Sequence, residues 1–98
     1  MESGIEIKCK KKFGQFLISE QPYAVINDVQ TKKLAWGKEV FIPLQPDKQY
    51  KIAVQFPYMN KAVAVATSII EVKSGEVQLW EYRTPLLMTS EGSLERKK

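Results

Sequence analysis

Histidine is absent from this sequence of 98 residues, and cysteine occurs once, at Cys9. Histidine is the commonest general base and a frequent metal ligand in proteins, so its absence removes the usual proton-transfer and metal sites. A lone cysteine forms no intrachain disulfide and cannot build a cysteine-rich zinc site. Glycine is scarce, with 5 residues, and none lies in a phosphate-binding loop or a GxSxG motif. We therefore expect no enzyme, no metal site and no cofactor.

Carboxylates are the remaining candidates for catalysis, because a pair of them can cleave a glycoside. The only aspartates are Asp28 and Asp47, and both fall in expected turns. The glutamates are scattered over positions expected to face water. Solubility and charge balance explain this distribution better than an active site does.

Long hydrophobic runs are also missing. No uncharged stretch is longer than residues 62–70, which is too short to span a bilayer, and residues 1–4 lack the features of a signal peptide. With one free cysteine, this pattern predicts a cytoplasmic protein; a mature fragment of an exported precursor would look the same, so that alternative stays open. Cys9 shares one side of an alternating segment with Ile5 and Ile7, which favours a buried, unreactive thiol.

Alternation of apolar and polar residues is the dominant pattern that is present. It is clearest in residues 44–56, where Tyr50, Ile52 and Val54 alternate with polar side chains, as in a strand with one face in a core. Similar segments recur along the chain at spacings of roughly eight to twelve residues, with turn signals between them. They predict an all-β fold: a single-domain antiparallel β-sandwich of about seven strands, immunoglobulin-like or related, over residues 1–90. Residues 91–98 are expected to form a flexible, polar, basic tail.

One segment is ambiguous between strand and helix. Asn60 could cap a helix over residues 60–70, since Val63, Thr67 and Ile70 fall near helical spacing. The segment is nevertheless rich in β-branched residues, which lose side-chain freedom in a helix. We therefore favour a strand.

Leu44, Pro46 and Tyr50 form the pattern Leu-x-Pro-x-x-x-Tyr immediately before the alternating residues. This pattern resembles the tyrosine corner of fibronectin type III and related immunoglobulin-like sandwiches. It is also similar to small bacterial modules of the PEGA and carboxypeptidase-regulatory type. The resemblance implies that the Tyr50 hydroxyl bonds to upstream backbone, that Leu44 packs beneath the loop, and that the domain is a non-enzymatic accessory or binding module. Asp47 stands where these families often have glycine.

Basic residues suggest one candidate binding surface. The net charge is +4, and Lys8, Lys10 and Lys12 would form a stripe on one face of a first strand. Such a stripe could bind an anion or follow nucleic-acid phosphates, with Phe13 or Phe16 stacking on bases. The alternative is an edge strand whose lysines prevent aggregation. The modest charge and the shortage of arginine favour this alternative.

Apolar residues suggest a second surface. Residues 62–66 read Ala-Val-Ala-Val-Ala, which would place valines on one face and alanines on an outer face open to close approach. In residues 77–83, Val77 and Leu79 face one way while Trp80 and Tyr82 face the other. Trp80 and Tyr82 would therefore either contact a partner protein or a second copy of the chain, or pack in the core, with the core favoured. The leading prediction is a non-enzymatic module for protein–protein interaction or structural support.

Overall fold

The computed structural model describes residues 2–10, 21–58, 61–84 and 91–98, and every regular element among them is a β-strand. The strands are β1 (Gly4–Lys10), β2 (Tyr23–Ile26), β3 (Gln30–Lys33), β4 (Glu39–Pro43), β5 (Tyr50–Tyr58), β6 (Lys61–Ile70), β7 (Val77–Arg83) and β8 (Ser93–Arg96). The all-β prediction is confirmed. The described residues hold eight strands where about seven were expected.

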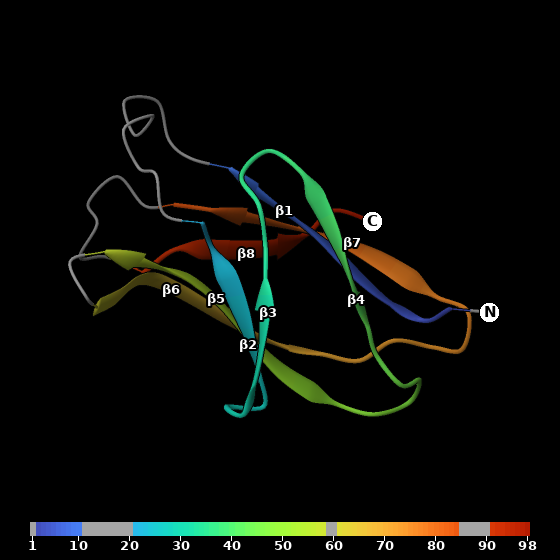
Figure 1. Ribbon diagram of the computed structural model, residues 1–98. Coiled ribbons are helices and arrows are strands. Elements are labelled where there is room, and N and C mark those ends of the chain that lie inside the picture. Colours follow the sequence, from blue (N-terminus) through green and yellow to red (C-terminus); the bar gives the residue numbers. More distant parts are fainter. Residues whose placement is uncertain (1, 11–20, 59–60, 85–90) are drawn as a thin grey trace.

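The strands form two four-stranded sheets, which face each other in Figure 1. Sheet A has the order β4-β1-β7-β8, and sheet B has the order β3-β2-β5-β6. This arrangement is compatible with the predicted sandwich. The expectation of a wholly antiparallel fold is wrong, however, because β1 and β7 pair in parallel. Parallel neighbours need a long connection, and here the chain forms all of sheet B between them.

The core lies between the sheets, on the inward side of each alternating strand. Ile5, Ile7 and Cys9 of β1 are completely buried, and so are Ile52, Val54 and Phe56 of β5. The short alternating segments therefore form one continuous core, as strands with one face in water do. Cys9 is part of this core, and burial raises the pKa of its thiol to about 12. The prediction that Cys9 is buried is confirmed.

The tyrosine corner is present at the start of β5. The backbone N–H of Gln45 donates a hydrogen bond to the Tyr50 hydroxyl oxygen at 3.1 Å, and Leu44 beneath the loop is only 6% exposed. Asp47 has φ of 60°, in the left-handed region where glycine is usual and aspartate is tolerated. The role that the resemblance implied for Tyr50 is confirmed.

Residues 91–98 do not form a flexible tail, which corrects the expectation from the sequence. β8 pairs with β7 in antiparallel register, and Leu79 N–H donates to the Lys98 carbonyl at 2.8 Å beyond the end of the strand. Leu94 is half-buried and packs against the core. The backbone, more than the side chains, holds this segment, so its polar composition concealed the strand.

β6 is a strand throughout, as favoured, but its outward side is the reverse of the one expected. Ala64 and Ala66 face the core, while Val65 is half-buried on the outer side. The small inward residues make room for Tyr82, whose hydroxyl donates to the Ala64 carbonyl at 2.5 Å. Close approach to the alanines therefore occurs within the domain. Gly92 N–H also donates to the Val65 carbonyl at 3.1 Å, which joins the β8 side of sheet A to β6.

Candidate functional site

The outer face of sheet A carries the lysines expected to form a basic stripe. Lys8 and Lys10 lie on the outward side of β1, whereas Lys12, like Phe13 and Phe16, lies outside the described residues. β1 runs between β4 and β7, so it is a central strand and the explanation by an edge strand is wrong. The Lys10 ammonium lies 2.8 Å from a Glu81 carboxylate oxygen. The Lys10 charge is therefore already paired within the sheet.

Glu81 is the centre of an ion-pair network on this face. Its carboxylate lies 2.9 Å from the Arg83 guanidinium and 3.5 Å from the Lys97 ammonium, in addition to Lys10. The residue is only 7% exposed. The hydrogen bond from Lys10, followed by the one from Arg83, lowers the pKa of Glu81 to about 2. The carboxylate thus stays ionised and holds three cations that would otherwise be available to an anion.

Two further carboxylates lie on the same face. Glu6 of β1 and Glu39 of β4 interact, and the hydrogen bond between the two carboxyl groups raises the pKa of Glu6. A surface that brings two acids together beside paired cations is not a continuous basic stripe. The geometry of sheet A therefore gives little support to phosphate binding.

Trp80 and Tyr82 project from the inward side of β7, beside Ile7 and Cys9 of β1 in the parallel register. Tyr82 is completely buried, and burial, reinforced by Cys9, raises the pKa of its phenol. Trp80 is half-buried, packs against the core and donates its indole N–H to Gln78 Oε1 at 3.0 Å. Tyr82 is not available to a partner, so its candidacy as a binding residue is corrected by its burial.

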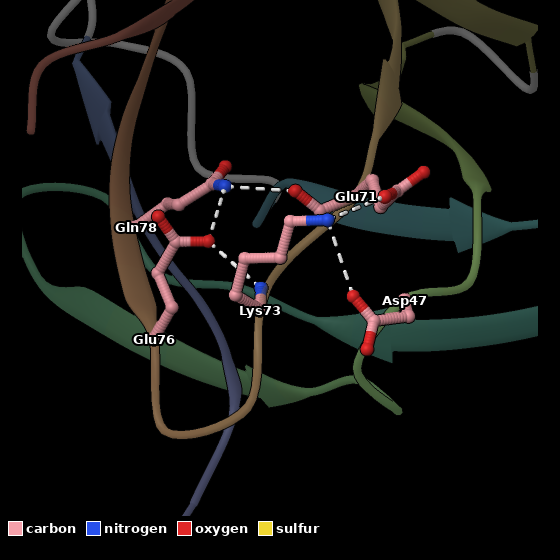
Figure 2. A network of polar contacts seen from close by, with 5 residues as sticks. All are labelled: Asp47, Glu71, Lys73, Glu76 and Gln78. Carbon is pink, nitrogen blue, oxygen red and sulfur yellow. Dashed lines mark hydrogen bonds and ion pairs between the residues drawn. The ribbon is translucent and has the colours of Figure 1, made fainter.

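Figure 2 shows a polar network that joins the β6–β7 loop to the loop before β5. The Lys73 ammonium lies 3.2 Å from Asp47 and 3.3 Å from Glu71, and these bonds, chiefly the one from Asp47, raise its pKa. Glu76 accepts the Lys73 backbone N–H at 2.9 Å, which is the main reason its pKa is lowered. The buried Gln78 amide donates to the Glu71 carbonyl at 2.9 Å. Every contact fixes a turn, so we assign this network a structural role.

The outer face of sheet B differs from that of sheet A because uncharged residues cross it. Thr31 is opposite Val25, Val25 is opposite Ala53, and Ala53 is opposite Thr67. These four residues form what we call the neutral row, which contains one residue from each strand of the sheet. Opposed residues in a ladder share a face, so the row is continuous.

The flanks of the neutral row are also largely uncharged. On the same face, Ile69 of β6 is 61% exposed. On the other side of the row, the Gln55 amide donates to the Tyr23 hydroxyl at 2.8 Å. Lys51 marks one end of the face and pairs with Asp28 at 3.2 Å. This face is the best candidate interaction surface in the described part of the chain.

Several hollows open on the surface of the described residues. One, of about 490 Å³, lies at the tyrosine corner between Ser3, Leu44 and Tyr50. Its Ser3 and Tyr50 hydroxyl groups already accept backbone hydrogen bonds, from Gly75 and Gln45. Another, of about 350 Å³, lies beside β6 and Gly92. A third, of about 330 Å³, adjoins the neutral row beside Tyr23 and β3. In the described residues, no three histidine, cysteine or acidic side chains gather as metal ligands.

The sequence pointed to the correct strand for this surface but to the wrong side of it. The valine–alanine segment was expected to be exposed through its alanines, whereas Val65, Thr67 and Ile69 face outward. The one sequence feature that could have indicated the inward side of β6 was the bulk of Tyr82, which requires small residues opposite it in the core. Without the strand pairing, the sequence did not show which segment lies opposite Tyr82.

Comparisons of the chain with protein-family models, curated proteins and solved structures find no match. In the described ranges, no helix is long and apolar enough to cross a membrane.

Proposed function

We propose that this chain is a non-enzymatic β-sandwich module, immunoglobulin-like in kind, that binds another protein through the outer face of sheet B. The main observation behind this proposal is the neutral row, which crosses all four strands of sheet B, whereas Lys10, Glu81 and Arg83 form ion pairs on the outer face of sheet A. The tyrosine corner at Tyr50 supports the immunoglobulin-like part of the proposal. A cytoplasmic location belongs to the same proposal, because the single cysteine is buried and unpaired.

The physical basis is the cost of removing charges from water. The centres of protein interfaces are depleted in charged residues and enriched in residues that bury apolar area. Val25, Ala53 and Thr67 can be covered without desolvating an ion, and Ile69 adds exposed apolar area beside them. Covering the face of sheet A would instead bury the Glu81 network, at a larger desolvation cost.

The alternative of anion or nucleic-acid binding through Lys8, Lys10 and Lys12 has weaker support. Lys10 is paired with Glu81, and the carboxyl groups of Glu6 and Glu39 lie on the same face. A partner other than a second copy is favoured because each copy has a net charge of +4 and would repel another.

The test compares two single substitutions on opposite faces. Ile69→Glu places a charge beside the neutral row, and Val77→Glu places the same charge on the outer face of sheet A, where Val77 is 44% exposed. Both positions are exposed, so we expect both variants to fold and to unfold at nearly the wild-type temperature. Proteins recovered with the wild-type chain by cross-linking in its own cells are identified, and their binding is then measured with purified components.

We expect the identified partner to bind the Val77→Glu variant normally and the Ile69→Glu variant at least tenfold more weakly, as for an unpaired charge in an apolar interface. Equal binding of both variants would overturn the assignment to sheet B. A dimer in light scattering that is lost with Ile69→Glu would show instead that the face binds a second copy. Tight, salt-sensitive nucleic-acid binding would favour the alternative.

A further inference from the structure

We propose that β3 is an open edge to which an extended, acidic segment of the partner adds as a further strand of sheet B. This inference rests on the proposed function, because it names how the partner binds and what chemistry it presents. It depends on three features of the edge: the direction of its backbone groups, the hollow beside it and its unpaired lysines.

The backbone of β3 is suited to strand addition. β3 is the last strand of sheet B, and Leu34 N–H donates to the Pro22 carbonyl at 2.9 Å just beyond its end. In an antiparallel ladder, hydrogen-bonded pairs alternate with non-bonded ones. The N–H and C=O groups of Thr31 and Lys33 therefore point away from β2. Along this outer edge they meet no hydrogen-bonding partner among the residues that the structure describes.

The other sheet edges of the described fold are less suited to an added strand. On β4, Leu44 N–H donates to the Ser3 carbonyl, so the backbone groups of the preceding residue, Pro43, point away from β1. Proline has no N–H to donate to an added strand. β6 is joined to the β8 side of sheet A through Val65 and Gly92. All four residues of β3 are exposed. Among the strands that the structure describes, β3 thus offers an accessible edge for an added strand.

A hollow of about 330 Å³ lies beside this edge, lined by Gln21, Pro22, Tyr23, Thr31 and Lys33. Thr31 and Lys33 are on the outward side of β3, on the same face as the neutral row. An added strand would project alternate side chains onto this face, and one of them would lie beside the hollow. The half-buried Tyr23 ring favours an apolar side chain at that point.

The charge of β3 favours an acidic segment as the added strand. Lys32 and Lys33 are adjacent and exposed, and neither forms an ion pair with another described residue. A second copy pairing β3 with β3 would oppose lysine to lysine, which is unfavourable across a ladder. An extended segment with acidic residues flanking an apolar one would match both the lysines and the hollow. Lysines that prevent self-pairing thus leave the edge open to a partner of opposite charge.

The probe is a short peptide in which valine alternates with glutamate, compared with a peptide in which lysine replaces each glutamate. Binding to the ¹⁵N-labelled chain is followed by amide chemical shifts and hydrogen exchange. We expect the acidic peptide to bind at least tenfold more tightly than the basic one, and to slow exchange of the outward amides of Thr31 and Lys33. Equal binding of the two peptides, or no protection at these amides, would overturn the proposal.

Two variants with matched controls test the edge itself. Thr31→Pro removes an outward N–H without removing a β2–β3 hydrogen bond, whereas Thr31→Ala keeps that donor. Lys33→Glu reverses a charge at the edge, and Lys38→Glu makes the same change at an exposed position outside β3. We expect Thr31→Pro and Lys33→Glu to lower the affinity for the acidic peptide by about tenfold, and the two control variants to change it little. Wild-type affinity in Thr31→Pro would overturn strand addition.

A peptide with methylated backbone nitrogens provides a test that does not depend on folding of the variants. It cannot donate hydrogen bonds to β3, so it should lose binding to the unmodified chain; retained binding would contradict the proposal. The identified partner then separates the two hypotheses. If partner binding is lost with Ile69→Glu but not with Thr31→Pro, strand addition is overturned and the proposed function stands. If Ile69→Glu does not change binding of the partner, the proposed function is overturned, whether or not the acidic peptide binds.

Discussion

Replacing Glu81 by glutamine is the sharpest test of the electrostatics of sheet A. Glu81→Gln keeps the size of the side chain but removes the charge shared by Lys10, Arg83 and Lys97. The three cations would then lie close together beside a neutral amide. We predict a loss of stability at neutral pH that disappears in acid.

The magnitude follows from the pKa and the exposure of the partners. A carboxyl whose pKa falls from an ordinary 4.5 to about 2 contributes on the order of 3 kcal/mol as an upper limit. The side chains of Lys10, Arg83 and Lys97 are 47%, 51% and 39% exposed, so water and salt weaken their attraction to Glu81. We therefore expect a loss of about 1–2 kcal/mol, which lowers the Tm of a domain of this size by roughly 5–15 °C.

The pKa of Glu81 also determines how the stability difference between wild type and Glu81→Gln changes with pH. Because folding depresses the pKa of Glu81, its stabilisation is fully present above pH 4.5 and is lost as the pH falls toward 2. The variant has no carboxyl to protonate at this position. The difference in unfolding free energy between wild type and variant should therefore be largest at neutral pH and should shrink steadily below pH 4.5.

The assay is urea unfolding of both proteins at several pH values from neutral to about pH 2.5. Glu95→Gln is the matched control, because Glu95 lies 3.2 Å from the same Lys97 but its side chain is 62% exposed. This control should change stability by less than about 0.5 kcal/mol. A Glu81→Gln loss that is independent of pH, or no larger than that of Glu95→Gln, would refute the reasoning.

Three further predictions concern the fold. Tyr50→Phe removes the acceptor for Gln45 N–H and should cost about 1 kcal/mol, or a Tm lower by roughly 4–8 °C; an unchanged Tm would contradict the structural role of the tyrosine corner. Gly92→Ala would place a methyl group 2.5 Å from the Ala64 carbonyl oxygen, so it should destabilise the chain by more than about 1 kcal/mol and speed amide exchange in β8. Cys9 should react with a maleimide at pH 8 only as fast as the chain unfolds, and rapid labelling of the native protein would disprove its burial.

The strands could be predicted where their signal is local. β5 and its corner are encoded by alternation and by the spacing from Leu44 to Tyr50, and the structure contains both. β8 could not be predicted in this way. It pairs through its backbone and buries little apolar area, so its polar composition suggested a tail.

The candidate site could be predicted only in part. Alternation shows that two sides of a strand differ, but where both sides are apolar it does not show which side faces the core. In β7 the inward side was decided by the pairing of Trp80 with Ile7 and of Tyr82 with Cys9. In β6 it was decided by the fit of Ala64 over Tyr82. Lys8 and Lys10 were correctly placed on one face, but the pairing of Lys10 with Glu81 depends on a strand distant in sequence.

The sequence by itself determined that this chain is an all-β protein, with a buried thiol and a tyrosine corner, because period-two alternation and short turn motifs act over a few residues. Tertiary structure alone decided the parallel pairing of β1 with β7, the ion pair of Lys10 with Glu81 and the neutral row on sheet B. Each of these depends on which strands become neighbours. Neighbour choice is set by the packing of the whole core, and no local pattern in the chain encodes it.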